Sequence, residues 1–313
     1  MENLLSPIPG IDDKEFISRL STLGDFLRAN LIGQEEVITA VTDLLCRAFC
    51  RMRFDEQPIA SILLPGPTGT GKTLLADLCN QHLFRTRSLL MRLDMSEYST
   101  PSSVDRLIGD KDIGLFESSY RKSFCRGVLL FDELEKAEAR VLDILLQILS
   151  AARLTVGNGQ TLDLSKFVVF ATSNIGSRVL MASRSMDRET VVDRTETAVE
   201  SEMRPEIVGR FDLIASFNKF SHDDLTQIAK LHMEKCLAII NSRGHELTVG
   251  DGVCGFIQRQ GYSEKFGARP IRNSAMRILG GAVSKAMLAN GGRPVRGVLQ
   301  YDRRANKCTL VGS

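Results

Sequence analysis

A glycine-rich segment at residues 66–73 has the composition and spacing of a phosphate-binding loop. It reads Gly-Pro-Thr-Gly-Thr-Gly-Lys-Thr, matches the pattern GxxxxGK[ST], and lies between a short apolar run and a predicted helix from Leu74 to Leu83. Glycines let backbone N–H groups surround a phosphate at a helix N-terminus, where a lysine neutralises charge and a threonine hydroxyl can ligate Mg²⁺. We therefore expect Lys72 to contact the β- and γ-phosphates of a nucleotide and Thr73 to bind Mg²⁺.

An acidic pair, Asp132 and Glu133, follows the apolar run Val128–Phe131. A buried strand that ends in two acids can place the first carboxylate beside a metal ion and the second where it polarises an attacking water. Alone, an Asp-Glu pair at a strand end is usually a solvated turn. Together with the phosphate-binding loop, the pair predicts hydrolysis of a nucleoside triphosphate such as ATP.

Five short apolar runs, separated by helical segments, must position these residues. Runs that are apolar on both faces are typical of a buried parallel sheet. They predict an α/β domain, with a parallel sheet flanked by helices, that ends near residue 220. The runs are 62–64, 89–93, 128–131, 167–171 and 213–215.

The two ends of the chain have a different pattern. From residue 221 the apolar residues recur at helical spacing, and two strand-like runs follow at 298–301 and 308–311, which predicts a smaller, mainly helical second domain. At the other end, Asp12 or Asp13 can cap one amphipathic helix that contains Phe16–Leu27. We expect an N-terminal extension at 1–26, a large domain at 27–220 and a small domain at 221–313.

The charge is balanced overall but uneven along the chain. The 313 residues include 40 Lys plus Arg and 38 Asp plus Glu, so the total gives no argument for a nucleic-acid partner. Residues 262–307, however, hold ten basic and two acidic side chains. A nucleic-acid motor is one explanation, but the aromatic and basic alternation that stacks bases is lacking. A basic small domain that faces the acidic large domain of a neighbouring copy is simpler.

Cysteine usage and the N-terminal residues bear on the compartment. The seven cysteines include no CxxC pair, which argues against a disulfide framework and a zinc site. The first residues lack a signal-peptide pattern, and no apolar run approaches the length of a membrane span. We expect a cytoplasmic protein with reduced cysteines and no membrane span.

Further motifs occur in order from about residue 27 to the end. Together with the phosphate-binding loop, they resemble the successive motifs of the AAA+ module of the Clp ATPases, in particular the second ring of the ClpA and ClpB type. They are Leu31-Ile32-Gly33-Gln34, Leu93–Tyr98, Arg106–Gly109, Leu129–Ala137, Thr172–Gly176, Arg204–Glu206 and Gly267–Pro270.

This resemblance implies a P-loop AAA+ fold with a small lid domain, and it implies a role for each matching residue. Glu133 would be the catalytic base, Asn174 the sensor 1 residue that orients water, and Arg210 an arginine finger for the neighbouring subunit. ATP would be bound by Leu31 and Ile32 around the adenine, by Pro67, Thr68, Gly69, Thr70, Gly71, Lys72, Thr73 and Leu74 around the phosphates, and by Asp132 and the sensor 2 residue Arg269. Thr73 and Asp132 would hold Mg²⁺.

An arginine finger makes activity depend on assembly, so the resemblance also implies a homo-oligomeric ring, a hexamer. Two of these residues have plainer interpretations that remain open. Arg210 can be an ordinary surface arginine in an ion pair, and Arg269 can form a salt bridge at a helix start.

The chain departs from the family in the segments that handle substrate. Only residues 110–115 separate Arg106–Gly109 from the next helix, so the glycine-rich pore loop is shortened and lacks its aromatic residue. We expect Phe116 and Tyr120 to pack in the core instead. Residues 153–162 are expected to form an intact hairpin with a Gly-Asn-Gly turn. No Ile-Gly-Phe-like tripeptide for docking a peptidase occurs between Asn174 and Arg204.

Two hypotheses about function follow. The first is an ATP-hydrolysing ring of the Clp type that remodels a protein partner without the usual aromatic pore loop. The second is an ATP-gated assembly or scaffold component of a larger bacterial apparatus for secretion, conjugation or phage functions. In that case the apolar face of Phe16–Leu27 could dock a partner, although it could equally pack on its own domain.

Overall fold

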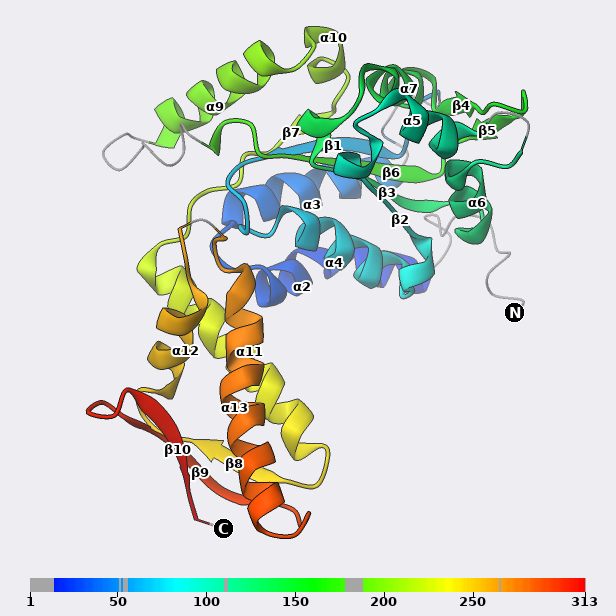
Figure 1. Ribbon diagram of the computed structural model, residues 1–313. Helices are drawn as coiled ribbons and strands as arrows, with labels where there is room; N and C mark the ends of the chain where they lie inside the picture. The colour runs from blue at the N-terminus through cyan, green and yellow to red at the C-terminus, as the bar shows by residue number, and fades with distance from the viewer. Residues whose placement is uncertain are drawn as a thin grey trace. The chain divides into compact units, whose positions relative to one another are not determined.

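The computed structural model of the protein describes residues 14–50, 52, 56–109, 112–177, 188–264 and 266–312. Two compact units make up the chain (Figure 1): the first extends to Pro67 and continues from Gly71 to Lys219, and the second comprises Thr68–Thr70 and Phe220–Ser313. The expected helix cap at Asp12 or Asp13 lies outside the described residues.

A five-stranded parallel sheet forms the centre of the first unit. Its order is β2-β3-β6-β1-β7, and every neighbouring pair is parallel. Every residue of β1, β3 and β6 is buried, which explains why these strands are continuous apolar runs in the sequence. The predicted parallel sheet is confirmed. The strands are β1 (Ala60–Pro65), β2 (Leu90–Asp94), β3 (Gly127–Asp132), β6 (Phe167–Ser173) and β7 (Leu213–Ile214).

Helices cover both faces of this sheet (Figure 1). Alternate strand residues serve two cores, because successive side chains of a strand point to opposite faces. On one face lie α1 (Lys14–Ser21), α2 (Leu23–Asn30), α3 (Glu35–Phe49) and α4 (Lys72–Phe84). On the other lie α5 (Pro101–Ile108), α6 (Leu115–Lys122), α7 (Ala139–Ala151), α9 (Arg188–Glu202) and α10 (Pro205–Val208).

The N-terminal segment forms two helices where the sequence pattern predicted one, so that expectation was wrong. Helix α1 ends at Ser21, and α2 begins at Leu23. The hydroxyl groups of Ser21 and Thr22 each donate a hydrogen bond to the carbonyl oxygen of Ser18 at 2.9 Å. Such side-chain bonds compete with the helical backbone ladder. Helix α2 also runs across the expected boundary between residues 26 and 27.

The apolar face of these two helices packs in the core of the first unit. Phe16 is 1% exposed, and Leu23 and Leu27 are fully buried. The Phe16 ring meets the Phe49 ring of α3 edge-on, with 4.9 Å between their centroids. The apolar face of Phe16–Leu27 is therefore largely used within its own unit, and Ile17 is its exposed apolar residue.

Replacement of Phe16 by alanine tests this packing. We expect Phe16→Ala to lower the free energy of unfolding by about 3–5 kcal/mol, because it leaves a cavity in the core. The matched control is Ile17→Ala on the exposed side of the same helix, for which a change within about 0.5 kcal/mol is expected. Urea denaturation followed by circular dichroism measures both. Equal small changes in the two variants would mean that α1 does not pack on the unit.

The predicted hairpin is also present, as β4 (Arg153–Thr155) paired antiparallel with β5 (Thr161–Asp163). Beside it, Phe116 is fully buried and Tyr120 is 8% exposed, so both pack in the core as expected. The Tyr120 hydroxyl donates a hydrogen bond to the carbonyl oxygen of Asp163 at 3.0 Å. Helix α6 is thereby attached to the hairpin.

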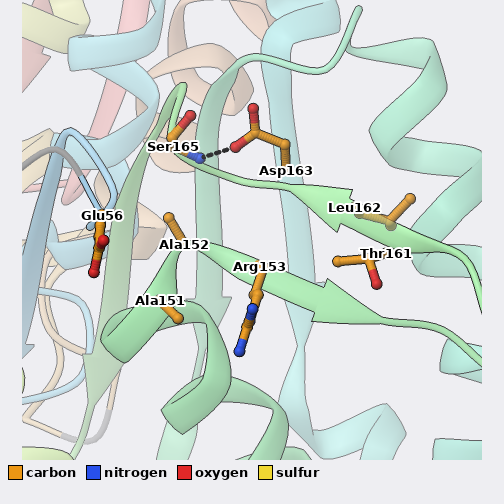
Figure 2. Close-up of a pocket in the computed structure, with 8 residues that line it drawn as sticks. All are labelled: Glu56, Ala151, Ala152, Arg153, Thr161, Leu162, Asp163 and Ser165. Carbon is orange, nitrogen blue, oxygen red and sulfur yellow. Dashed lines mark hydrogen bonds between the residues drawn. The ribbon is translucent and has the colours of Figure 1, made fainter.

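A pocket of about 510 Å³ lies at the base of this hairpin (Figure 2). Glu56 precedes β1 and Ser165 precedes β6, so the pocket lies at the amino ends of the strands, whereas the phosphate-binding loop follows the carboxyl end of β1. We assign it no part in nucleotide binding. It is lined by Glu56, Ala151, Ala152, Arg153, Thr161, Leu162, Asp163 and Ser165.

The second unit is mainly helical. Its first helix, α11 (His222–Asn241), begins with a capping box in which Ser221 and Asp224 each accept a hydrogen bond from the other's backbone N–H. Strand β8 was not predicted, because its four residues are too short a run to stand out, although they alternate between exposed and more buried positions. The remaining elements are β8 (Glu246–Val249), α12 (Val253–Gly261), α13 (Arg269–Ala289), β9 (Arg296–Asp302) and β10 (Lys307–Val311), with the strands in the order β10-β9-β8. In the described part of the chain, no helix has the length and apolar character needed to cross a membrane.

Candidate functional site

Two glycines fix the path of the loop between β1 and α4. Gly66 has a φ of 145°, and Gly71, which caps α4, has a φ of 108°. A Cβ atom on Gly66 would lie 2.7 Å from the carbonyl oxygen of Phe217, and one on Gly71 would lie 2.6 Å from Leu31 Cδ1. A larger residue would be strained at both places, because both φ values are positive and, at Gly66, a backbone oxygen blocks the Cβ position.

Lys72, the first residue of α4, folds back over this loop and is 7% exposed. Its ammonium group donates to the carbonyl oxygens of Gly66 at 2.6 Å and Pro67 at 2.8 Å, and to Asn174 Oδ1 at 3.1 Å. These acceptors match the three N–H donors of an ammonium group. A positive charge is therefore fixed beside a helix N-terminus, an arrangement that favours an anionic phosphate.

Asp132, at the end of β3, gathers hydroxyl groups around a buried carboxylate that is 6% exposed. Its Oδ1 atom accepts from the hydroxyl of Thr73 at 2.9 Å and from that of Thr172 at 2.5 Å. Its Oδ2 atom accepts from Arg92 Nη2 at 2.5 Å, which compensates the buried negative charge. A carboxylate and a hydroxyl this close are the hard oxygen ligands that Mg²⁺ prefers, so the chemistry of Thr73 and Asp132 fits that ion.

Glu133 has a backbone conformation that is uncommon for its residue type. Its φ of 59° and ψ of 51° are left-handed, and its backbone N–H donates to the Thr172 hydroxyl at 3.0 Å. Non-glycine residues in this region concentrate at functional sites. The Glu133 carboxylate forms an ion pair with Lys136, and this hydrogen bond is the main reason that the pKa of Lys136 is raised.

Asn174 connects the loop to the turn after β3. Besides accepting from Lys72, its side-chain amide donates to Glu135 Oε1 at 2.9 Å, and its backbone N–H donates to Glu135 Oε2 at 3.2 Å. The carboxyl ends of β1, β3 and β6 meet at one edge of the sheet, which is why these residues lie together.

Sequence reasoning missed four polar residues of this cluster. Arg92 interrupts the apolar run of β2, which could have indicated a charged partner on the neighbouring strand. Glu135 and Lys136 follow the acidic pair directly, yet their contacts could not be read from their spacing. Thr172 lies in an otherwise apolar strand and is buried.

Arg92 and Lys136 also influence Asp94 at the end of β2. Burial opposes ionisation of Asp94, but hydrogen bonds from the Ser96 hydroxyl and backbone, together with the charges of Arg92 and Lys136, outweigh it and lower the pKa of this carboxyl group. Asp94 therefore stays ionised, and the edge of the site carries charges of alternating sign.

The other residues predicted for the site have different positions. Leu31 is buried against Gly71, and Ile32 is half-buried next to it. Arg269 is the first residue of α13 in the second unit. Of the remaining loop residues, Thr70 is buried, Gly69 is half-buried, and Thr68 and Leu74 are exposed.

Arg210 is not part of the cluster around Lys72. The Ser61 hydroxyl donates to the Arg210 carbonyl oxygen at 3.3 Å, which places Arg210 beside the start of β1. At a rise of about 3.3 Å per residue, Ser61 lies about 16 Å from Gly66. The Arg210 side chain is exposed and forms no ion pair with any other residue that the structure describes. For the plainer interpretation, an ordinary surface ion pair, the described residues therefore offer Arg210 no partner.

The fold and the site together define a P-loop nucleotide-binding module, in which the loop follows β1, the acidic residue ends β3, and β6 lies between these two strands. Comparison with known families agrees and is more specific. The chain belongs to the family described as AAA domain (Cdc48 subfamily), which matches residues 57–214. Residues 220–300 match the C-terminal, D2-small domain, of ClpB protein. The predicted resemblance to the Clp type is confirmed.

Comparison with individual proteins also finds similarity to Clp proteins. Chaperone protein ClpB 2 of Nostoc sp. is 35% identical to this chain over 280 residues, which are 86% of this chain and 32% of that protein. The ATP-dependent Clp protease ATP-binding subunit ClpA homolog of Porphyra purpurea is 34% identical over 87% of this chain and 35% of its own length. The chain thus spans about a third of the length of these relatives.

A solved structure extends the similarity to the fold. The Hsp104–ADP complex of S. cerevisiae matches with a TM-score of 0.84 and 27% identity, over 95% of this chain and 53% of that chain. The arrangement of a parallel sheet with flanking helices, followed by a small helical unit, is therefore shared with a protein solved as an ADP complex.

Proposed function

We propose that this chain hydrolyses ATP in a ring assembly and thereby remodels a protein partner. The observation that carries the proposal is the cluster of Lys72, Thr73, Asp132 and Asn174 at one edge of the sheet, where each polar group is held by a neighbour at 2.9–3.1 Å. The relatives named as ClpB chaperones and as an ATP-binding Clp subunit support the same activity.

Each residue of the cluster has a proposed role. The loop and Lys72 bind the phosphates, Leu31 and Ile32 line the adenine site, and Arg269 senses the nucleotide from the second unit. Thr73 and Asp132 hold Mg²⁺, which supplies charge neutralisation when bound.

Two further residues act on the attacking water. Asn174 orients it, and the Glu133 carboxylate accepts its proton. Catalysis of phosphoryl transfer depends on such positioning and on charge neutralisation rather than on covalent chemistry by the protein.

Arg210 supports a ring. It lies at the opposite end of β1 from the phosphate-binding loop of its own chain, and its side chain is exposed. A finger that serves a neighbouring subunit needs these two properties. We propose a homo-oligomeric ring, a hexamer, in which each Arg210 completes the site of the next subunit.

The mode of contact with the partner polypeptide follows from the connection between α5 and α6. A Cβ atom on Gly114 would lie 2.4 Å from the backbone nitrogen of Gly109, so the two ends of this connection touch. The nearest aromatic residues, Phe116 and Tyr120, are buried. We propose that the partner is contacted by the β4–β5 hairpin and the surface around it, without an aromatic pore loop.

Residues 178–187 lie outside the described residues, so the lack of a peptidase-docking tripeptide stays a prediction.

Substitution of Lys72 tests the proposed function. We expect the wild-type chain to hydrolyse ATP only with Mg²⁺, and Lys72→Met to bind ATP at least about tenfold more weakly, because a buried charge contact with the phosphates is lost. The matched control is Lys230→Met on the exposed surface of α11. Phosphate release and calorimetry measure the two effects. Tight ATP binding without any hydrolysis by the wild type would support the ATP-gated scaffold instead.

A further inference from the structure

Glu135 contacts the site without belonging to any motif role assigned above. It lies in the short helical turn η4 (Leu134–Lys136) that follows Asp132 and Glu133, and it is exposed. Its two carboxylate oxygens accept from Asn174, one from the side-chain amide at 2.9 Å and one from the backbone N–H at 3.2 Å. Asn174 in turn accepts from Lys72 at 3.1 Å. The three residues form a continuous hydrogen-bonded chain.

The Glu135 carboxylate determines which end of the Asn174 side-chain amide faces Lys72. An asparagine side chain has a donor end and an acceptor end that can exchange by rotation, whereas an ionised carboxylate only accepts. Glu135 therefore requires the NH₂ group of Asn174 on its own side and leaves the amide oxygen toward the Lys72 ammonium. The reversed amide would direct N–H donors at the ammonium, where they would displace it from the loop.

We propose that Glu135 is a positioning residue that, through Asn174, keeps an acceptor facing Lys72 and so holds the ammonium group ready for nucleotide phosphate. This inference rests on the proposed function, since it concerns the same phosphate site. Glu135 does not itself touch the nucleotide. Its effect comes from preorganisation: a charge that is already in place needs no rearrangement when the phosphate binds.

A glutamine at position 135 cannot perform this function, although it has the same shape. If its oxygen faces the Asn174 side chain, its NH₂ group opposes the backbone N–H of Asn174. If it is turned round, its NH₂ group opposes the Asn174 amide, which is relieved only by rotating that amide and placing donors against Lys72. Every arrangement that keeps both contacts with Asn174 leaves two donors facing each other.

A charge-conserving exchange restores the match. In the double variant Glu135→Gln with Asn174→Asp, the glutamine oxygen accepts from the backbone N–H of residue 174. Its NH₂ group then donates to one oxygen of the new aspartate, and the other oxygen accepts from Lys72. The donors and acceptors of these three contacts are paired again, and the net charge of the pair is unchanged.

The test measures ADP affinity of the full chain by calorimetry. We expect Glu135→Gln and Asn174→Asp each to weaken ADP binding about tenfold, and the double variant to return to within about threefold of wild type. Glu97→Gln is the control for charge loss alone, because it removes another exposed carboxylate from η3 (Met95–Tyr98), a short helical turn that contacts η4. Thermal denaturation without nucleotide separates binding effects from any change in stability.

Two results would overturn the inference. One is wild-type ADP affinity in Glu135→Gln, and the other is a double variant whose loss is the product of the two single losses, since that outcome means independent contributions. A wild-type chain that binds no ADP overturns the proposed function as well. Binding by the wild type with no effect of Glu135→Gln overturns only the positioning role.

Discussion

Arg210→Ala is expected to lower the rate of ATP hydrolysis by about 10³-fold or more while ADP affinity stays at the wild-type value. The reason is the position of Arg210 beside Ser61, at the start of β1, whereas the proposed nucleotide site lies beyond the other end of that strand. In the proposed ring, an arginine placed there acts on a different copy of the chain. Steady-state phosphate release and calorimetry measure the rate and the affinity.

A mixing experiment distinguishes a finger that acts between subunits from an effect on folding. Arg210→Ala retains its own Glu133, and Glu133→Gln retains its own Arg210. Each variant alone is expected to be nearly inactive, whereas mixed assemblies regain activity wherever an intact site meets an intact finger. Arg296→Ala, which removes only an exposed ion pair with Glu246, is the control and should remain close to wild type. Mixtures with no recovery would contradict the assignment of Arg210.

The sequence was sufficient to predict those parts of the fold and the site whose local pattern has one physical explanation. The buried strands β1, β3 and β6 are apolar throughout because both faces of a central parallel sheet are covered. The loop before Lys72 is recognisable because only glycine tolerates the approach of Phe217 and Leu31. In both cases the constraint falls on neighbouring residues of one segment, so the pattern of that segment shows it even though the groups that impose it are distant in the sequence.

The sequence did not predict the hydrogen bonds between side chains that are distant in the chain. Arg92 and Asp132 lie 40 residues apart in the chain, and Glu135 and Asn174 lie 39 apart. Their contacts depend on strand order and on the direction of a turn, neither of which a spacing encodes. The break between α1 and α2 was missed for a different reason, since the hydroxyl of Thr22 competes for a carbonyl inside a pattern that is otherwise helical.

The same distinction, between a local pattern and contacts with distant residues, applies to Glu133, the proposed catalytic base. The sequence suggests Glu133 as the base because it follows Asp132, the proposed metal ligand, and the structure adds two facts that bear on this proposal. Its left-handed backbone is held by the bond from its N–H to Thr172, and its carboxylate is paired with Lys136. Thr172 also donates to Asp132, so one hydroxyl fixes the proposed metal ligand and the proposed base relative to each other.

Glu133→Gln is accordingly expected to lower the rate of ATP hydrolysis by about 10²- to 10⁴-fold, the usual range for loss of a general base. Glutamine keeps the volume and the contact with Thr172 through the backbone, so ADP affinity and the thermal midpoint should remain near the wild-type values. Glu97→Gln serves again as the control for loss of a nearby charge. Single-turnover hydrolysis isolates the chemical step, and a wild-type rate in that measurement would show that water is activated by another group. A loss of ADP affinity equal to the loss of rate would instead place Glu133 in nucleotide binding.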